Sequence, residues 1–280
     1  MIANLTLAAI NEALEKDQEK KHRKHLGASL IGRKCARQIW YGFHWCEIEH
    51  HGGKQLRLFK RGQDMENVFD IYLKSLGCDT WPLDPATGKQ WQISDCNGHF
   101  GGSSDGKVQG IPEMPAEIMT VEMKTHGDKS YKKLVKEGLC KSKPEHFDQA
   151  QIYTYKLGHK WCLYIAINKN DDLLHLELIQ VNPVYCKTLL AKAAKIIAAV
   201  EPPPKIKDDV SFYLCHESFC KFRQICHFGK LPEKNCRTCK HSTPVDGGKW
   251  LCVRYNYDLT EENQNAGCKT HEFKSCFLTE

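Results

Sequence analysis

The sequence has no long hydrophobic run. No window approaches the roughly 18 uninterrupted apolar residues that a membrane-spanning helix needs, so we expect no contact with a membrane. The stretch MIANLTLAAINEALEK also lacks the basic leader, the long apolar segment and the cleavage-like end of a signal peptide, and it predicts an amphipathic helix instead. These absences predict a cytoplasmic protein.

Internal repeats and low-complexity tracts are absent as well. The chain has 280 residues, of which 41% are hydrophobic and 26% are charged, as is typical of a soluble globular protein. This length predicts one large domain with a smaller accessory part. The net charge of +6 is compatible with an anionic partner but does not by itself indicate one.

The apolar periodicity predicts alternating helices and strands up to about residue 200. Helices are expected over 3–24, 57–77, 145–157 and 185–200, and strands over 89–94, 99–109, 116–125, 161–168 and 173–181. The sequence Glu201-Pro202-Pro203-Pro204 then predicts a stiff break, beyond which apolar residues give way to cysteines.

One predicted strand carries a polar face with a carboxylate and an ammonium group. Alternate side chains of a strand share a face, so the apolar residues at 119, 121 and 123 point one way and Thr120, Glu122 and Lys124 the other. Glu122 and Lys124 then lie about 7 Å apart along the strand. Alone, such a pair is more often part of a solvated sheet face than of a reactive site.

A nearby aspartate strengthens the chemical interpretation. Asp105 precedes this strand in the segment SSDGKV, where Gly106 allows a close approach of the backbone to another group. If the two segments are neighbours, Asp105 and Glu122 converge on a divalent cation, Mg²⁺ or Mn²⁺, which takes oxygen ligands and keeps positions open for water and phosphate oxygens. Lys124 would orient or help to deprotonate the water and stabilise charge on the phosphate.

Fifteen cysteines are distributed unevenly, and eight of them fall between Cys215 and Cys276. Disulfides are rare in a reducing compartment, so clustered cysteines there more often bind metal. A CxxC pair followed by two single cysteines predicts a closed, structural zinc site in residues 229–280. The expected ligands are Cys236, Cys239, Cys252 and Cys268, with His241, His271 or Cys276 as possible substitutes.

In its order and spacing, the set Asp105, Glu122 and Lys124 resembles the PD-(D/E)XK nuclease superfamily, whose pattern is Asp, a variable gap, then Asp/Glu-x-Lys on the next strand. The segment HFDQAQIYTYKLG is similar to a helix of the RecB-like and phage-exonuclease branch. That resemblance assigns Gln149 and Tyr153 to the site, and Gln151 with Tyr155 has the same spacing.

The same resemblance extends to the N-terminal part of the chain. GQDMENVF resembles the branch's Gly-then-acid helix, which makes Glu66, rather than the nearby Asp64, an additional metal ligand or an orienting residue. The segment 29–41, SLIGRKCARQIWY, resembles the branch's N-terminal signature and implies a phosphate contact for Arg37, for which a helix-surface role is the alternative.

AddB-like members of the branch carry a 4Fe-4S cluster on one cysteine before the nuclease core and three after it. The resemblance assigns these positions to Cys35, Cys215, Cys220 and Cys226, although the gap from Cys215 to Cys220 is longer than usual in the family. Separately packed or zinc-bound thiols are the alternative. The cluster would connect the beginning of the chain to its later part like a staple.

Together these patterns predict an α/β protein with a restriction-endonuclease-like central mixed sheet flanked by helices, plus a small C-terminal cysteine-rich metal-binding module. The expected segments are a nuclease domain over 1–200, an iron-sulfur segment over 201–228 and a zinc module over 229–280. The resemblance implies a metal-dependent nuclease of a bacterium or phage-infected host cell, an exonuclease acting on DNA with a free end. A non-catalytic nucleic-acid-binding metalloprotein, or a scaffold subunit that docks a protein partner through the zinc module, are the alternatives.

Overall fold

The computed structural model describes residues 2–17 and 22–278, which form two compact units. Unit 1 contains the described residues within 1–21 together with 49–93 and 103–183, and unit 2 contains 22–48, 94–102 and the described residues from 184 onward. Within these ranges, none of the helices combines the length and the apolar character that crossing a membrane requires. The division into segments 1–200, 201–228 and 229–280 stays a prediction.

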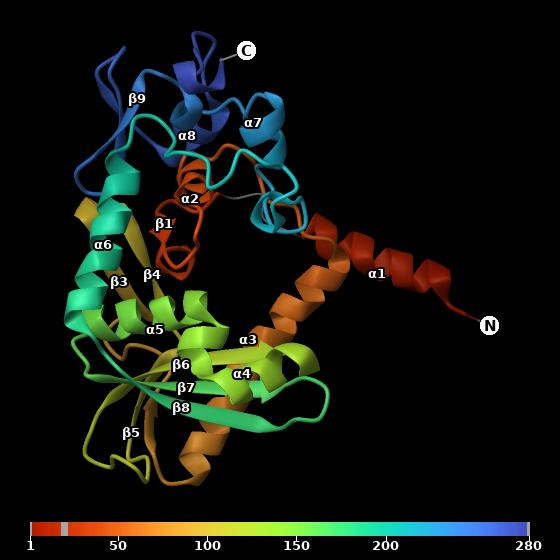
Figure 1. Cartoon of the computed structure of the whole chain (residues 1–280), viewed down its shortest axis with the longest axis vertical. Coiled ribbons are helices and arrows are strands. Elements are labelled where there is room, and N and C mark those ends of the chain that lie inside the picture. The colour runs from red at the N-terminus through yellow and green to blue at the C-terminus, as the bar shows by residue number, and fades with distance from the viewer. Residues whose placement is uncertain (1, 18–21, 279–280) are drawn as a thin grey trace. The chain divides into compact units, whose positions relative to one another are not determined.

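Unit 1 is built on a five-stranded mixed sheet of order β2-β5-β6-β7-β8 (Figure 1). Its strands are β2 (Asp79–Trp81), β5 (Gly106–Gln109), β6 (Met119–His126), β7 (Trp161–Asn168) and β8 (Leu174–Gln180). Only β6 and β7 pair in parallel, and the other neighbours are antiparallel. Parallel neighbours need a crossover, which α4 (Asp128–Ser142) and α5 (Pro144–Lys156) supply. The predicted α/β class with a mixed sheet flanked by helices is confirmed.

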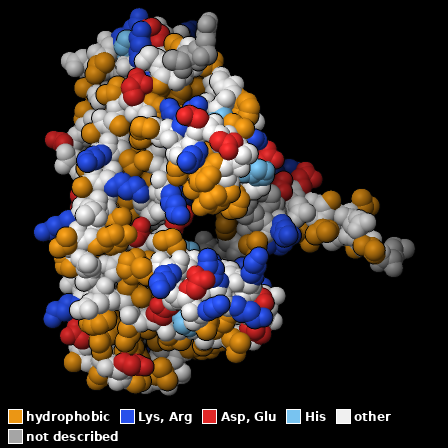
Figure 2. All heavy atoms as spheres, viewed as in Figure 1, with side chains coloured by type: hydrophobic (Ala, Val, Ile, Leu, Met, Phe, Trp, Pro, Cys, Tyr) orange, Lys and Arg blue, Asp and Glu red, His pale blue; other side chains and the backbone are white. Residues whose placement is uncertain are grey.

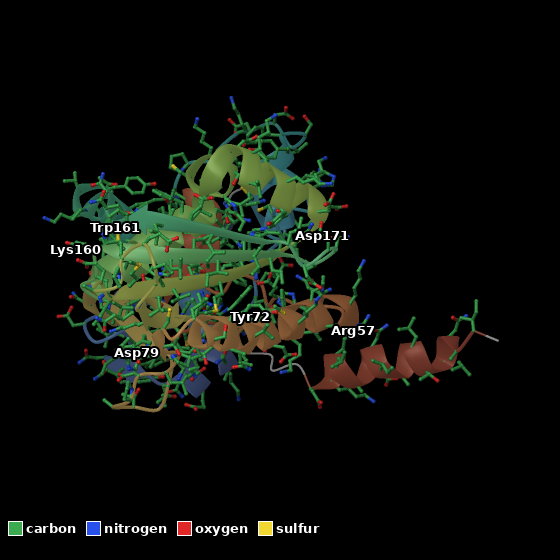
Figure 3. All side chains as sticks on the ribbon, turned by 90° about the horizontal axis from the view of Figure 1, so that it is seen from below. Arg57, Tyr72, Asp79, Lys160, Trp161 and Asp171 are labelled. Atoms are coloured by element: carbon green, nitrogen blue, oxygen red, sulfur yellow. The ribbon has the colours of Figure 1, made fainter. Side chains whose placement is uncertain are left out.

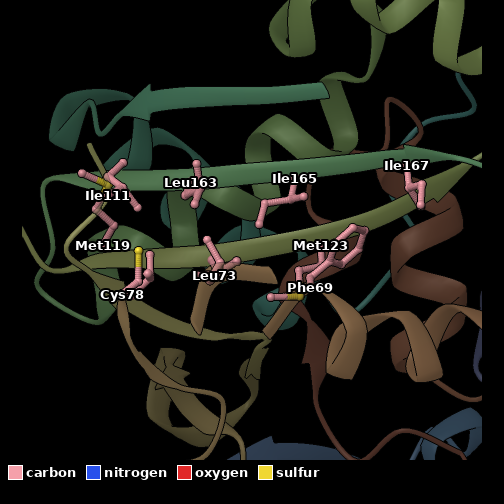
Figure 4. Close-up of a cluster of buried hydrophobic side chains, with 11 residues drawn as sticks. Phe69, Leu73, Cys78, Ile111, Met119, Met123, Leu163, Ile165 and Ile167 are labelled. Carbon is pink, nitrogen blue, oxygen red and sulfur yellow. The ribbon is translucent and has the colours of Figure 1, made fainter. Parts of the chain in front are cut away.

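One face of this sheet packs against α3 (Gly53–Ser75). Figure 3 labels Arg57 and Tyr72 on this helix. Phe69 and Leu73 of α3 point at Met123 of β6 and at the apolar side chains of β7 (Figure 4). The buried cluster is completed by Cys78, Val108, Ile111, Met119, Val121, Leu163, Ile165 and Ile167. The odd-numbered residues of β6 therefore form the core face, as the alternation predicts.

The opposite face of the sheet packs against α4 and α5. A second buried cluster joins the helix residues Leu134, Leu139 and Ala150 to the strand residues Cys162, Tyr164, Ala166 and Ile179. The hydroxyls of Thr120 on β6 and Thr154 on α5 are hydrogen-bonded beneath the helix. The polar face of β6 is thus covered by a helix, and it is not a solvated sheet face.

Several element boundaries differ from the predicted ones. The helix expected over 3–24 is α1 (Asn4–Lys16), residues 22–24 are not helical, and the expected continuation over 18–21 lies outside the described residues. The strand expected over 99–109 divides at a bend, Asp105, into β4 (Phe100–Ser104) and β5. The helices and strands expected from residue 145 to 200 are confirmed within two residues, the last of them being α6 (Pro183–Ala198).

Apart from α6, unit 2 consists of short elements. It contains a three-stranded sheet of order β11-β10-β9, whereas in the sheet of order β1-β4-β3 the residues of β3 and β4 are divided between the two units. Besides α6, its helices are α2 (Ala36–Phe43), α7 (Arg223–Phe228) and α8 (Glu261–Ala266). The remaining strands are β1 (Leu26–Gly27), β3 (Trp91–Asp95), β9 (Ser242–Val245), β10 (Lys249–Cys252) and β11 (Tyr257–Leu259), and the 3₁₀ turns are η1 (Ala28–Leu30), η2 (Cys96–Gly98), η3 (Tyr213–Cys215), η4 (Cys236–Thr238) and η5 (Ser275–Phe277).

A buried arginine holds the core of unit 2 together. The guanidinium carbon of Arg237 lies 3.7 Å from the centre of the Trp45 ring and 4.7 Å from that of Trp250. Its N–H groups donate to the Phe43 carbonyl at 3.0 Å and to Gln264 Oε1 at 2.8 Å. Because cation–π contacts and hydrogen bonds replace its hydration, Arg237 can be 1% exposed. The cysteine-rich segment therefore shares a core with residues 22–48 and does not build its own.

We predict that replacing Gly106 with alanine destabilises the protein by about 1–3 kcal/mol. Gly106 has a φ of 148°, and a Cβ there would lie 3.1 Å from both the Trp81 carbonyl oxygen and Pro82 Cα. The matched control is Gly62→Ala in α3, where a Cβ meets nothing within 4 Å, and where we expect stabilisation of about 0.5–1 kcal/mol. Urea unfolding measures both changes, and equal effects of the two substitutions would contradict this account.

Candidate active site

The bend between β4 and β5 positions Asp105 over β6. Gly106, the next residue, pairs with Val121, so Asp105 comes level with Glu122 on the neighbouring strand. Asp105 Oδ2 accepts a hydrogen bond of 2.8 Å from the Met123 backbone N–H, which fixes the carboxylate against β6. The sheet pairing therefore brings together the acids that lie 17 positions apart in the sequence.

Lys124 connects the two carboxylates. Its Nζ donates to Glu122 Oε1 and to the Met123 carbonyl oxygen at 3.1 Å, and it lies 3.8 Å from Asp105 Oδ2. The side chain of Glu122 is 1% exposed, that of Asp105 12% and that of Lys124 25%. All three side chains are largely buried, and that of Glu122 is the most deeply buried of them. The structure thus places Asp105, Glu122 and Lys124 around a common point.

A third carboxylate, that of Glu66 on α3, interacts electrostatically with Asp105, Glu122 and Lys124. Burial, reinforced by the charge of Asp105 and opposed by Lys124, raises the pKa of Glu66 to about 7. Burial raises the pKa of Glu122 to about 8, with Lys124 opposing this shift and Asp105 and Glu66 adding to it. By contrast, Asp64 is exposed and pairs with Lys60 at 2.6 Å. Of the two acids in GQDMENVF, Glu66 is the one coupled to the site.

The charge state of Lys124 follows from its neighbours. Burial favours the neutral amine, but the carboxylates of Glu122 and Asp105 outweigh this effect and raise the pKa of Lys124. Lys124 is therefore held as an ammonium ion, which suits it to stabilise negative charge. In this state it does not have the free lone pair that a base would need to deprotonate a water.

Two members of the group, Glu66 and Lys124, line a cleft of about 630 Å³ within unit 1. One wall comes from α3, with Leu58, Phe59, Gly62, Gln63, Glu66 and Phe69. The other comes from the end of β6 and the helices after it, with Met123, Lys124, Thr125, His126, Ser130, Lys143 and His146. The sequence analysis did not identify Lys143 and the two histidines, because nothing in the periodicity places the start of α4 and of α5 beside the end of β6.

Gln149 and Tyr153 are both buried and lie four residues apart on α5. They share a helix face with His146, whose side chain lines the cleft. Gln151 instead makes two hydrogen bonds of 2.8 Å with the backbone at and just beyond the end of β8, so its amide has a structural partner there. This geometry favours the pair Gln149 and Tyr153 over Gln151 and Tyr155, and the role of the pair stays a prediction.

All four cysteines of the predicted iron-sulfur set line one small cavity of unit 2. Cys35 is the residue before the first turn of α2, Cys215 ends η3, and Cys220 and Cys226 flank the start of α7. Arg37 and Lys205 line the same cavity. Burial, reinforced by the other cysteines of the set, raises the pKa of Cys220 to about 11. Sequence spacing left Cys215 doubtful, and the structure places it with the other three.

The four cysteines of the predicted zinc set line a second cavity of unit 2, together with His241 and His271. These cysteines are Cys236, Cys239, Cys252 and Cys268. Both histidines also have protein partners, since His241 pairs with Glu272 at 3.1 Å and His271 contacts Thr238 Oγ1 at 3.3 Å. Of the possible substitute ligands His241, His271 and Cys276, the two histidines therefore border this cavity.

Within residues 2–17 and 22–278, no three histidine, cysteine, aspartate or glutamate side chains are arranged to hold a metal ion, and this applies to both cysteine sets as well as to the carboxylates. Mg²⁺ needs fewer protein ligands than this, since one or two carboxylates with water and phosphate oxygens commonly suffice. Glu122 Oε2 is buried and has no hydrogen-bond partner in the described part of the chain. A buried, unpartnered carboxylate oxygen beside two further acids fits a hard divalent cation, and Asp105 and Glu122 are the residues that could hold one.

No protein-family model matches the chain, and no curated protein does. Solved structures that are similar to it include the following three, each at 16% identity. A crystal structure of SSO0001 covers 79% of this chain and 96% of its own, with a TM-score of 0.46. For LHK-Exo in complex with dAMP, the similarity covers 68% of this chain and 91% of that chain, with a TM-score of 0.47. For an alkaline exonuclease (LHK-Exo) from Laribacter hongkongensis, it covers 67% of this chain and 91% of that chain, with a TM-score of 0.46. These values describe a distant likeness in the arrangement of the chain.

The raised pKa values predict how stability depends on pH when divalent cations are removed by EDTA. A carboxyl group whose pKa is higher in the folded state stabilises the fold below its unfolded pKa, and this contribution is lost as the pH rises through the folded value. For Glu122 this window runs from 4.5 to about 8. Since one pKa unit corresponds to about 1.4 kcal/mol, the free energy of unfolding should decrease by more than 1 kcal/mol across the window.

Glu122→Gln removes this titration, so the variant should show a shallower decrease than the wild type between about pH 5 and about pH 9. Urea unfolding at several pH values measures the difference. A gap between the two proteins that stays constant over this range would show that Glu122 titrates normally.

Proposed function

We propose that the protein is a divalent-metal-dependent nuclease that hydrolyses phosphodiester bonds. The observation that carries this proposal is the convergence of Asp105, Glu122 and Lys124 beside an open cleft. Its resemblance to the PD-(D/E)XK pattern of the RecB-like and phage-exonuclease branch further supports an exonuclease acting on DNA with a free end.

The residues of the group divide the work by charge. Asp105 and Glu122 would hold Mg²⁺ or Mn²⁺, which activates water and polarises a phosphate when bound. Glu66 sits across the cleft with a pKa of about 7, so it can orient a water or complete the coordination. Lys124 places an ammonium next to the two carboxylates, where it stabilises the negative charge that develops on the phosphate during attack.

Gln149 and Tyr153 complete the proposed pocket from α5. The resemblance assigns both to the site, and both are buried on the helix face that carries His146, a residue of the cleft wall. The apolar side chains of Leu58 and Phe59 on α3 are exposed at 43% and 45% and can contact bases on the other side.

We predict that Asp105→Asn and Lys124→Met each reduce Mg²⁺-dependent cleavage by about 10²-fold or more, the effect of losing a preorganised charged group. Glu66→Gln should also reduce the rate, whereas the matched control Asp64→Asn should not, because Asp64 pairs with Lys60 in solvent. End-labelled single-stranded and double-stranded DNA and RNA serve as substrates. Full cleavage by Asp105→Asn would refute the proposed function, and binding without cleavage by the wild type would indicate a non-catalytic binding protein.

We also propose that the two cysteine sets bind metal. The resemblance to AddB-like nucleases assigns a 4Fe-4S cluster to Cys35, Cys215, Cys220 and Cys226, and the fact that all four line one cavity supports this assignment. The cationic side chains of Arg37 and Lys205 there would offset the charge of four thiolates. For Cys236, Cys239, Cys252 and Cys268, the ligand type and the shared cavity support a structural zinc ion.

Metal analysis of protein purified anaerobically tests both assignments. We predict about four irons and one zinc per chain, following the ligation rules for these sites. Cys220→Ser should lower only the iron content and Cys239→Ser only the zinc content, while the exposed Cys140 provides a control whose replacement by serine changes neither. A colourless protein with two zinc ions would assign the first set to zinc and contradict the cluster.

A further inference from the structure

A chain of three hydrogen bonds runs beneath one wall of the cleft and plays no part in holding the proposed metal. Ser130 Oγ lies 3.1 Å from His126 Nδ1, His126 Nε2 lies 3.0 Å from the Tyr164 hydroxyl, and the same hydroxyl lies 3.0 Å from His146 Nδ1. Tyr164 is fully buried, so these two histidines are the partners of its hydroxyl. The chain fixes the His146 ring and leaves its Nε2 as the nitrogen available to a ligand.

This series of hydrogen bonds also determines whether His146 presents an N–H donor or a bare ring nitrogen to the cleft. Tyr164 has one hydroxyl proton and contacts two ring nitrogens, so it donates to one and accepts from the other. When it donates to His146 Nδ1, a neutral His146 must carry its proton on Nε2. His126 then donates from Nε2 to Tyr164 and accepts at Nδ1 from Ser130, so every group in the chain is satisfied. An anion in the cleft favours this arrangement because it meets an N–H donor.

The positive charge of this wall comes from lysines and not from the imidazoles. Burial, together with Lys124, lowers the pKa of His146 to about 3, and burial with Lys143 lowers that of His126 to about 4, so both rings are neutral at neutral pH. Lys143 lines the cleft beside His146, and no acidic side chain in the described ranges pairs with it. An unpaired ammonium next to a fixed N–H donor is a suitable environment for a phosphate oxygen.

The surface leading to this wall is basic. Helix α4 and the residue after it carry Lys129, Lys132, Lys133, Lys136, Lys141 and Lys143 against two acids, Asp128 and Glu137. Figure 2 shows blue side chains gathered around this helix. The lysines of α4 would attract a polyanion, and Lys143, the residue after the helix, lines the cleft.

We propose that Lys143 and His146 form a phosphate-binding subsite that holds a backbone phosphate of the nucleic acid strand next to the scissile one. This inference rests on the proposed nuclease function and names residues that neither the motif nor the metal requires. Lys143 contributes charge, and His146 contributes a directed hydrogen bond from Nε2. Tyr164 and His126 act through His146 as positioning residues and do not touch the strand.

Binding of a fluorescein-labelled single-stranded DNA oligonucleotide, measured by anisotropy over a range of NaCl concentrations, tests the subsite. The parent protein is Asp105→Asn, so binding is measured without cleavage. In this background Lys143→Gln should weaken binding about tenfold and lower the slope of log K against log salt by about 0.7, the value for one phosphate contact. Lys89→Gln, which removes the same charge from an exposed position outside the cleft, should change neither.

His146→Phe should weaken binding about fivefold and leave the salt slope unchanged, because a neutral donor is lost. Tyr164→Phe should weaken it as well, and the double variant should bind no more weakly than His146→Phe alone, because Tyr164 acts only through His146. Thermal melting of each variant confirms folding. Wild-type protein that cleaves DNA, combined with Lys143→Gln that keeps the parent's affinity and slope, would overturn the subsite alone. Absence of DNA binding by the parent together with absence of cleavage by the wild type would overturn both proposals.

Discussion

The antiparallel pairing of β5 with β6 is the constraint on which the candidate site depends. It sets Gly106 opposite Val121, and the missing Cβ of Gly106 lets the strand lie against the Trp81 carbonyl oxygen. Asp105 is then held at the Met123 N–H, within 3.8 Å of the Lys124 ammonium. A shift of one residue in this register would move Glu122 and Lys124 to the face that packs against α3.

The electrostatics of the site follow from this placement. Asp105 raises the pKa of Glu122 and of Glu66, and within the described residues Lys124 is the cation that lowers both pKa values. Burial is the main reason why the pKa values of Glu122 and Glu66 are raised, and the neighbouring carboxylates add to the cost of ionising each of them. A bound divalent cation would offset this cost by neutralising the carboxylates. The same acids that are costly to ionise without a metal would therefore be its ligands.

Unit 2 depends on a different interaction, the burial of Arg237 among aromatic rings. This packing joins residues 22–48 to the C-terminal segment, and it brings Cys35 into the same unit as Cys215, Cys220 and Cys226. The thiols line two cavities in a unit whose core is formed by aromatic packing. Metal binding would therefore add to an existing framework in this unit, in contrast to small domains that fold only around their ion.

The strongly periodic parts of the sequence predicted their structure well, because burial on one face imposes the same alternation on sequence and strand. The alternation from Met119 to Lys124 therefore predicted both the core face and the polar face. Helix α4 was not predicted, since its apolar residues are few among many lysines and Gly138 interrupts it with a φ of 74°. Strands β9, β10 and β11 have three or four residues each, too few for a period to be recognised.

The site was predicted only as far as local patterns extend. The sequence itself contains Asp105, Glu122 and Lys124 in the expected order, and one strand pairing brings them together. The sequence does not decide between Gln149 and Gln151, because both have the same spacing to a tyrosine. The tertiary contact of Gln151 with the end of β8 distinguishes the two. The contribution of Lys143 and His146 depends on how the crossover packs, which no local pattern specifies.

The most direct test of the central claim is a crystal of the protein soaked in Mn²⁺ and measured for anomalous scattering. The account predicts a peak bound by the carboxylates of Asp105 and Glu122, at the hard-cation oxygen distance of about 2 Å. The peak should be absent in a crystal of Glu122→Gln. Mn²⁺ bound elsewhere, with none between these two acids, would contradict the assignment of this group as the metal-binding centre.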